Sequence, residues 1–452
     1  MRVPLLGFMP DLDPTTPGAI VDGDAFVPTL QGISAANVPI NEPRNALAAP
    51  PTGSYATMLL DGTRRLLAST NSAIYEATGA TWTDRSRGGG YTGVQRQRYC
   101  TFGNNVLATN RSQAIGQAAP GGSFADIAGA PKASIIVSVN GFVMAFDTND
   151  GTYGDRPDGW WCSGLRDQTL WTPSAATQAA NGRLLDTPGK ITAGAALGSD
   201  VVAYKASSMY VGRYVGPPLI WAWQRVPGEV GTAGPESVVV VEDRHYFVGQ
   251  NDFYVFDGTV PQPLNAPCRE WFNANINETY RSNIIGAVDV PRSLIYWHYP
   301  STASADGSLD SVLIYNYRTN QWGKQAMTIN VPLLYSYGAL SYDALGSNYA
   351  TYNDLPAVSY DSPLWTANTT VPAVFKGAFL YSLTGTPGAS WIKTGDFGDV
   401  TDNMFLKRVT PRYRYIAPFV RDSGDPINGP PSIPVETVTF ATNYYRDTLG
   451  DT

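Results

Sequence analysis

The residues that most often carry catalysis or bind metals are scarce in this sequence. Two histidines, His245 and His298, occur in 452 residues, and each lies within a strand-like pattern. The three cysteines, Cys100, Cys162 and Cys268, are far apart, and none belongs to a C-x-x-C pair. No histidine or cysteine spacing fits a metal site, and three scattered cysteines form no disulfide framework. We therefore expect no metal, no other cofactor, and three buried, reduced thiols.

Charge is also scarce. Only 15% of the residues are charged, and the net charge is −7, whereas soluble domains typically contain roughly 25% charged residues. The low fraction favours a protein whose surface is largely covered by neighbours in an assembly. The acidic balance argues against tight nucleic-acid binding, because such binding requires clustered Lys and Arg side chains that displace counterions from the phosphates. It is compatible with a wall that nucleic acid passes without adhering.

Long apolar segments and helical patterns are missing as well. No stretch approaches 18 consecutive apolar residues, so the sequence predicts no membrane span. The first eight residues, MRVPLLGF, lack the apolar core of a signal peptide. The best helical candidate is short and covers residues 266–276. Most of the remaining chain consists of short strand-like runs separated by Gly, Asn, Asp and Ser turns.

Similar units of paired strands recur along the chain. Each unit has an apolar strand, a small polar turn, and a second strand rich in aromatic or β-branched residues. The clearest strands begin at residues 73, 106, 142, 201, 245 and 294. A loose period of roughly 40–45 residues is the length of a four-stranded propeller blade. Residues 237–258 show the pattern best, with three strands joined by tight hairpins and closed by Asp257-Gly258.

These patterns predict an all-β protein built as a β-propeller of six or seven blades over residues 54–384. A series of β-sandwiches is the alternative architecture. Residues 1–53 are rich in Pro, Asp, Asn and Ala. They predict an extended N-terminal arm with little regular structure, packed on the C-terminal part or on a neighbour. Residues 385–452 contain alternating strand patterns around a Pro- and Gly-rich stretch, and they predict a small C-terminal β module.

No catalytic constellation stands out. Residues 147–151, D-T-N-D-G, begin like a calcium loop but lack the third acidic position and the closing Glu, so a polar turn is the better interpretation. No G-x-S-x-G motif occurs to indicate a nucleophilic serine. Glycoside hydrolysis requires two carboxyl groups facing a sugar, and no such pair is singled out. We expect no enzymatic activity.

One local excess of positive charge lies near the N-terminal end of the predicted propeller. It consists of Arg64, Arg65, Arg85, Arg87, Arg96 and Arg98. One interpretation is a solvated face, or ion pairs with neighbouring carboxylates. The other is an electrostatic contact with DNA or with an acidic partner ring. We expect these arginines at a contact between subunits or rings, paired with carboxylates, and not on a DNA-facing surface.

One segment is specific enough to suggest a family. Residues 160–173 read W-W-C-S-G-L-R-D-Q-T-L-W-T-P. This resembles the W-S-x-L-x-D-x-x-x-W-x-P signature of the tail tubular protein B family, the nozzle proteins of podoviruses, with Cys162 as an extra residue. Further similar stretches cover most of residues 1–325. They include residues 6–18, 189–194, 210–212, 235–239, 253–258 and 313–322.

The resemblance implies a fold, a place and a set of partners. Nozzle proteins are β-propellers arranged in a six-fold ring below the portal and adaptor of a short-tailed bacteriophage. The family therefore implies a structural virion protein of the tail, assembled in the cytoplasm of the bacterial host. Its partners would be further copies of itself, the tail adaptor protein, tail fibres or spikes, and genomic double-stranded DNA that passes during ejection without specific binding. The family has no catalytic residues to carry over.

The tryptophans of this segment have two interpretations. We expect Trp160, Trp161 and Trp171, and likewise Trp322, to pack between blades or at a subunit interface, because large aromatics bury extensive apolar area. The alternative is a sugar-binding platform. Two other function classes therefore remain open beside the nozzle ring. One is a propeller-type polysaccharide depolymerase or glycosidase, and the other is a propeller module that binds carbohydrate or protein.

Overall fold

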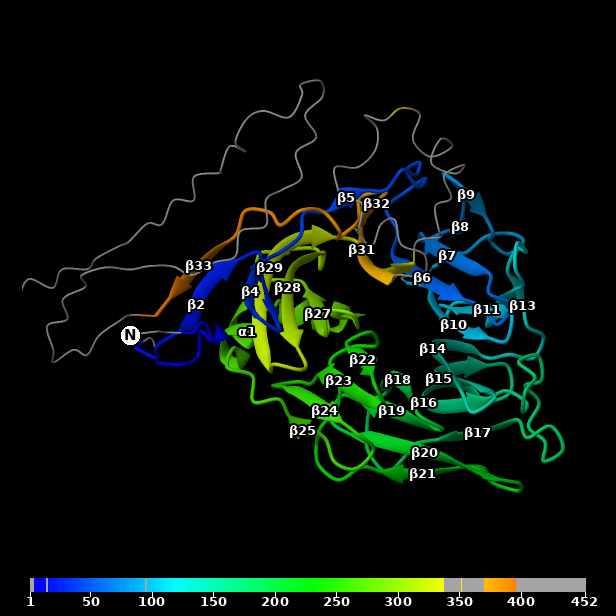
Figure 1. Cartoon of the computed structure of the whole chain (residues 1–452). Coiled ribbons are helices and arrows are strands. Elements are labelled where there is room, and N and C mark those ends of the chain that lie inside the picture. The colour runs from blue at the N-terminus through cyan, green and yellow to red at the C-terminus, as the bar shows by residue number, and fades with distance from the viewer. Residues whose placement is uncertain (1–3, 14, 94–95, 337–350, 352–369, 396–452) are drawn as a thin grey trace, which may run out of the picture. The chain divides into compact units, whose positions relative to one another are not determined.

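The computed structural model describes residues 4–13, 15–93, 96–336, 351 and 370–395. Within these residues, seven antiparallel sheets follow one another along the chain, each with four consecutive hydrogen-bonded strands (Figure 1). The first strands of successive sheets contact each other in order, and β30 of the last sheet contacts β6 of the first. The sheets therefore close into a ring. The prediction of a β-propeller is confirmed, with seven blades in the described part of the chain.

The strands of the first four blades follow the chain in order. Blade 1 comprises β6 (Gly53–Met58), β7 (Arg64–Ser69), β8 (Ile74–Thr78) and β9 (Thr81–Asp84). Blade 2 comprises β10 (Arg98–Phe102), β11 (Asn105–Thr109), β12 (Gly116–Ala118) and β13 (Ala125–Asp126). Blade 3 comprises β14 (Lys132–Val139), β15 (Phe142–Asp150), β16 (Gly154–Cys162) and β17 (Ala180–Arg183). Blade 4 comprises β18 (Ile191–Leu197), β19 (Asp200–Lys205), β20 (Met209–Gly216) and β21 (Ile220–Arg225).

Blade 5 also follows the chain in order, whereas blades 6 and 7 add strands from the N-terminal segment. Blade 5 comprises β22 (Val238–Val241), β23 (Arg244–Val248), β24 (Phe253–Phe256) and β25 (Gln262–Pro263). Blade 6 comprises β26 (Ile285–Asp289), β27 (Leu294–Tyr299), β28 (Leu309–Asn316) and β29 (Gln321–Ile329), and is extended outward by β3 (Phe26–Thr29) and β4 (Gly32–Ala35). Blade 7 comprises β30 (Val331–Ser336), β31 (Thr370–Lys376), β32 (Phe379–Ser382) and β5 (Ile40–Asn41).

The N-terminal segment contains more regular structure than its composition predicts. It supplies β5 as the outer strand of blade 7, where Ser382 pairs with Ile40, so the two ends of the propeller interlock. It also supplies β3 and β4 to blade 6. The expectation of an arm with little regular structure was wrong in this respect. The physical reason is that short apolar runs such as Phe26-Val27 find hydrogen-bonding partners on blade edges about 300 residues away.

A small terminal sheet lies against blade 6. It is formed by β1 (Gly7–Phe8), β2 (Ala19–Asp24) and β33 (Trp391–Thr394), in that order, and both β1 and β2 contact β29. Beside it lies the helix α1 (Arg269–Asn275), which confirms the helix expected over residues 266–276. The carboxylate of Asp11 accepts hydrogen bonds from the backbone N–H groups of Glu270 and Trp271 at 2.7 and 2.9 Å. The C-terminal β module predicted over residues 385–452 is described only for residues 385–395, which include β33, and residues 396–452 lie outside the described residues.

The apolar core lies between blades, because each sheet packs a neighbour on both of its faces. Strands buried on both faces read as continuous apolar runs, as in Val201-Val202-Ala203 of β19, all of which are fully buried. Close approach between blades 3 and 4 requires a glycine. A Cβ at Gly194 would lie 2.7 Å from the ring of Phe146, so any larger residue would force the two blades apart.

Candidate functional site

All four predicted tryptophans are buried between blades. Trp160 and Trp161 are neighbours on β16, so they point to opposite faces of blade 3. Trp160 joins the core between blades 3 and 4, whereas Trp161 and Trp171 join the core between blades 2 and 3. Trp322 on β29 lies in the core of blades 5 and 6. None of the four is more than 6% exposed, so none of them offers an open ring face to a sugar.

The loop that follows β16 forms a fixed corner. The Trp171 indole N–H donates a hydrogen bond to the Gln168 carbonyl at 2.8 Å. The backbone N–H of Gly164 donates to the Leu170 carbonyl at 2.7 Å, which closes the base of the loop. With its tryptophans anchored, the loop leaves Leu165 and Leu170 facing outward, 36% and 41% exposed. The part of this segment that is open to a partner therefore combines these two leucines with polar residues such as Arg166 and Thr169.

The arginines that the sequence groups together form three separate networks. Arg65 of β7 is buried and donates two hydrogen bonds to the Glu76 carboxylate, at 2.6 and 3.1 Å. Arg85 donates to the same carboxylate at 3.0 Å. Arg87 pairs with Asp126 of blade 2 at 2.7 Å. Arg64 is the first residue of β7 and pairs with Met58, the last residue of β6. These carboxylates belong to the same chain, so they neutralise Arg65, Arg85 and Arg87 without any partner.

The third network crosses the axis of the propeller. Arg96 and Arg98, at the start of blade 2, both bind the carboxylate of Glu236, which precedes the first strand of blade 5. Arg98 also donates a hydrogen bond to the Ser134 carbonyl of blade 3 at 3.0 Å. Burial raises the pKa of Glu236, but the two guanidinium groups outweigh it and hold that pKa below its usual range. Blades 2 and 5 are three positions apart in a ring of seven, so these side chains span the central opening.

The expectation that these arginines lie at a contact between subunits or rings stays a prediction. Within the chain, carboxylates pair with Arg65, Arg85, Arg87, Arg96 and Arg98. The sequence could not reveal this, because Arg98 and Glu236 are 138 residues apart. A carboxylate held between two guanidinium groups is also a poor general acid or base, since its proton affinity is lowered.

The two histidines are structural. His245 of β23 donates from Nε2 to the Ala196 carbonyl at 2.8 Å and accepts at Nδ1 from the Tyr204 hydroxyl at 2.6 Å. This arrangement fixes one neutral tautomer and ties blade 5 to blade 4. Burial lowers the pKa of His245 to about 4 and that of His298 to about 3. Both side chains are nearly inaccessible to solvent, so neither can reach a substrate.

Metal-binding and nucleophilic groups do not gather in the described part of the chain. No group of three or more His, Cys, Asp or Glu residues there is arranged to hold a metal ion. Asp147 lies in β15, not in a turn, and its carboxylate accepts from Ser134 and pairs with Arg111. The three cysteines are buried and unpaired. Among the described residues, no helix is long and apolar enough to cross a membrane.

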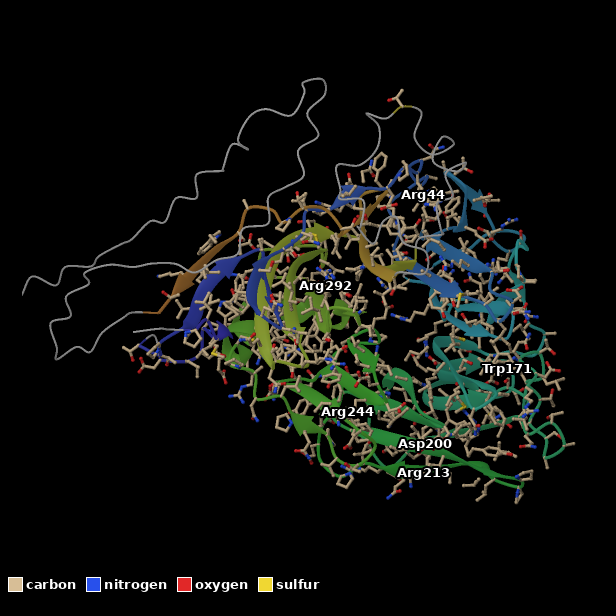
Figure 2. All side chains as sticks on the ribbon, in the orientation of Figure 1. Arg44, Trp171, Asp200, Arg213, Arg244 and Arg292 are labelled. Carbon is tan, nitrogen blue, oxygen red and sulfur yellow. The ribbon has the colours of Figure 1, made fainter. Side chains whose placement is uncertain are left out.

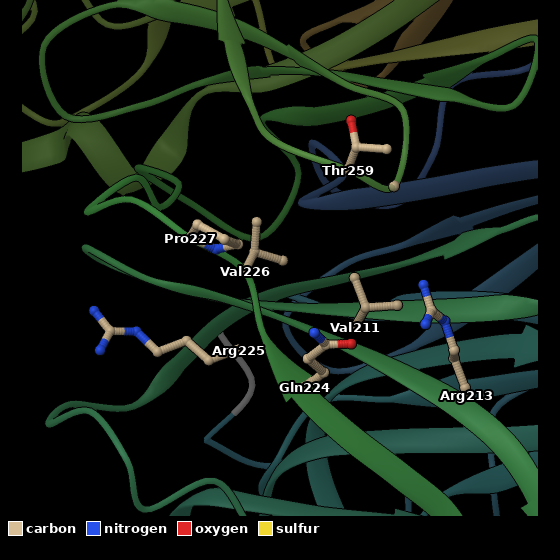
Figure 3. A pocket seen from close by; sticks show the side chains of 8 residues that line it. Val211, Arg213, Gln224, Arg225, Val226, Pro227 and Thr259 are labelled. Atoms are coloured by element: carbon tan, nitrogen blue, oxygen red, sulfur yellow. The ribbon is translucent and has the colours of Figure 1, made fainter.

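One cavity of about 310 Å³ lies at the outer side of blades 4 and 5 (Figure 3). Its walls come from β20, β21, the residues after β21 and the turn after β24. They are Val211, Arg213, Gln224, Arg225, Val226, Pro227, Gly258 and Thr259. Arg213 pairs with Asp200 at 3.2 Å, and Figure 2 labels both on blade 4. Arg225 forms no ion pair within the described part of the chain. The cavity is thus a positively charged recess beside an outer strand.

Comparison with known proteins adds little beyond the fold. No protein-family model and no curated protein sequence matches the chain. The computationally designed Ika8 protein is 11% identical with a TM-score of 0.38, over 76% of this chain and 99% of that one. PorZ, a surface component of the type-IX secretion system of Porphyromonas gingivalis, is 11% identical with a TM-score of 0.42, over 79% of this chain and 40% of that one. YCF48 bound to a D1 peptide is 12% identical with a TM-score of 0.42, over 80% and 99%. These similarities carry no functional argument.

Proposed function

We propose that this chain is a non-catalytic structural subunit of the tail nozzle of a short-tailed bacteriophage. Several copies would form a ring below the portal and adaptor, and the bore of that ring would conduct genomic DNA. The observation that carries the proposal is the segment 160–173. Its residues resemble the family signature, and its buried tryptophans hold a rigid corner whose leucines face outward.

The architecture supports a load-bearing role. A closed ring of sheets leaves only short outer edges, and β5 from the N-terminal segment locks the first and last blades together. The ion pairs of Arg96 and Arg98 with Glu236 bridge the axis of the single propeller. DNA would therefore pass through a bore formed between subunits, and not through the centre of one chain.

The charge distribution supports a bore that does not retain DNA. The chain carries a net charge of −7, and five arginines of its one positive cluster bind carboxylates of the same chain. Each phosphate neutralised by a free Lys or Arg would add affinity and slow the passage of the polyanion.

The depolymerase alternative has no supporting observation among the described residues. Its requirement is a pair of convergent carboxyl groups in a pocket. Glu236 reaches the axis, but it is bound by two arginines, and the cavity beside blade 4 is lined by arginines without a carboxylate. The lectin alternative predicted a sugar platform at the tryptophans of residues 160–173, and Trp160, Trp161 and Trp171 are buried.

Electron microscopy of the purified full-length protein tests the proposal. Class averages should show a six-fold ring with an open bore, and fluorescence anisotropy with duplex DNA should show no micromolar binding at physiological salt. A monomer that cleaves or binds polysaccharide would contradict the nozzle function. Micromolar binding to DNA would contradict the claim of a non-adhesive bore.

A further inference from the structure

We propose that Arg96 and Arg98 form a binding site for a free, small oxyanion, of the phosphate or carboxylate class, at the axis of the propeller. Glu236 occupies part of this site as an internal ligand, and a second anion from solvent completes it. The inference goes beyond the proposed function and does not depend on ring assembly, because every residue of the site belongs to one chain. An anion held at the axis of one propeller also leaves the proposed bore between subunits unaffected.

The two guanidinium groups converge on a single carboxylate. The Nε atoms of Arg96 and Arg98 donate to the same oxygen atom, Oε1 of Glu236, at 2.5 and 3.0 Å. Arg96 also binds the second oxygen, Oε2, through Nη2. A guanidinium fork holds a free carboxylate or a phosphate with this same two-point geometry. The contact with Glu236 therefore shows the class of ligand that these two arginines hold.

The positive charge of the two arginines is only half compensated. Glu236 supplies one negative charge for two guanidinium groups. The other carboxylate that acts on Arg98 is Asp147, and Asp147 pairs with Arg111 at 2.9 Å. Burial lowers the pKa of Arg98, and the charge of Arg96 adds to this effect while Glu236 opposes it. An uncompensated charge away from bulk water is unfavourable, so a further anion beside the two guanidinium groups is favourable.

Both guanidinium groups keep N–H donors for a further ligand. Arg98 uses Nη1 for the Ser134 carbonyl at 3.0 Å, and no described group accepts from its Nη2. In Arg96 it is Nη1 that has no acceptor among the described residues. Neither of these nitrogens is a buried atom, and the side chains of Arg96 and Arg98 are 21% and 23% exposed. A dissolved anion can therefore reach both arginines.

The backbone on both sides of the site is held in place. Arg98 is the first residue of β10 and pairs with Thr109 of β11. On the opposite side, the Glu236 carbonyl accepts a hydrogen bond from the Gly286 N–H at 2.7 Å, and Glu236 forms a parallel bridge with Ile285 of β26. Groups that are already positioned lose little conformational freedom when a ligand binds. The site is therefore preorganised.

Blade 1 contains a similar group of charges that is closed to solvent on one side. Glu76 binds Arg65 and Arg85 at 2.6 and 3.0 Å. The Arg65 side chain is 0% exposed, and its Nε, Nη1 and Nη2 all donate, to Glu76 and to the Ala118 carbonyl. A dissolved anion meets only Arg85 there and cannot bridge two guanidinium groups. This group is a matched control within the same chain.

Titration of the full-length protein with inorganic phosphate tests the site. We expect calorimetry at constant ionic strength to show saturable binding of one phosphate per chain. R96Q should weaken this binding by about tenfold or more, because one of the two guanidinium groups is lost, and circular dichroism verifies that the variant is folded. R318Q removes a 59% exposed arginine of blade 6 and should leave the binding unchanged. The absence of saturable binding, or equal weakening by the two variants, would overturn the inference.

Anion rescue of a carboxylate deletion is the second test. E236A removes the internal ligand and should lower the thermal midpoint of unfolding. Acetate or phosphate should restore most of this loss, whereas chloride at the same ionic strength should not. E76A should also lower the midpoint, but acetate should not restore it, because Arg65 is closed to solvent.

Equal rescue by chloride, or equal rescue of E76A, would show general charge screening and would contradict a site at the axis. If E236A does not fold, the phosphate titration of R96Q decides the question. Neither measurement depends on the oligomeric state, so failure of the axial site and failure of the nozzle ring are distinguishable.

Discussion

Arg98 of blade 2 and Glu236 before blade 5 form an ion pair across the propeller axis, with Nε and Oε1 3.0 Å apart. Arg96 binds the same carboxylate. Blades 3 and 4 separate the two sides along one path around the ring, and blades 1, 7 and 6 along the other, so the pair acts as a strut between distant parts of the ring. Each of these side chains is only about one-fifth to one-quarter exposed.

Removing the carboxylate should therefore destabilise the propeller. E236Q leaves two guanidinium groups without a counter-charge. We expect the free energy of unfolding to fall by about 2 kcal/mol, which is below the range for fully buried ion pairs because water reaches this pair. Urea unfolding measures the loss. E270Q removes the exposed partner of Arg269 and should cost less than about 1 kcal/mol. Equal effects of the two variants would contradict the role of a strut.

Acid should destabilise the protein through its histidines. The pKa of His245 is about 4 and that of His298 about 3 in the folded state, both below the ordinary value near 6.5. The unfolded chain therefore takes up protons first as the pH falls. The contribution of the two neutral histidines to the free energy of unfolding is complete above about pH 6.5. Below that pH it declines by about 1.4 kcal/mol per pH unit for each histidine, until the pKa of the folded state is reached. The lowered pKa of Glu236 acts in the same direction at lower pH.

Urea midpoints measured between about pH 7 and pH 5 check this dependence. H298F replaces a buried imidazole whose Nδ1 has no hydrogen-bond partner. We expect this variant to lose less stability over the interval than the unmodified protein does. A variant with an unchanged slope would show that His298 is not buried in its neutral form.

Trp171 of the corner loop should contribute strongly to the stability of the folded chain. Trp171 is 2% exposed, and W171A should cost roughly 3–5 kcal/mol, the range for truncating a large buried aromatic. W391A removes a 54% exposed ring and should change the free energy of unfolding of the isolated chain by less than about 1 kcal/mol. Retained stability in W171A together with lost glycan binding would instead support the lectin alternative.

The cysteines should be unreactive in the folded protein. Burial raises the pKa of the Cys100 and Cys162 thiols to about 12 and that of Cys268 well above its usual value. Since the thiolate is the reactive form, a thiol reagent should modify none of them quickly before unfolding and all three afterwards. Rapid modification of one native thiol would show that its blade opens.

Local patterns in the sequence were sufficient to predict the strands of single blades, but not to predict how the ring of blades closes. Residues 237–258 predict three strands, and β22, β23 and β24 form there because their hairpins depend on neighbours in sequence. Strand β5 is two residues long, and its partner β32 lies some 340 residues further on. A strand of this kind exists only because a distant edge supplies its hydrogen bonds, so no local periodicity announces it.

The candidate surfaces were harder to predict than the fold. The tryptophans of residues 160–173 could be interpreted as packing residues, because their size makes burial favourable. The arginines could not be sorted into networks, because their partners Glu76, Asp126 and Glu236 lie on different strands or blades.

The native mass of the purified full-length protein is the most direct test of the central claim, which is assembly into a ring. The account predicts a single species of about 290 kDa, six times the 48.7 kDa chain. It should persist on dilution. A species of 48.7 kDa for the unmodified protein at every concentration tested would contradict the account.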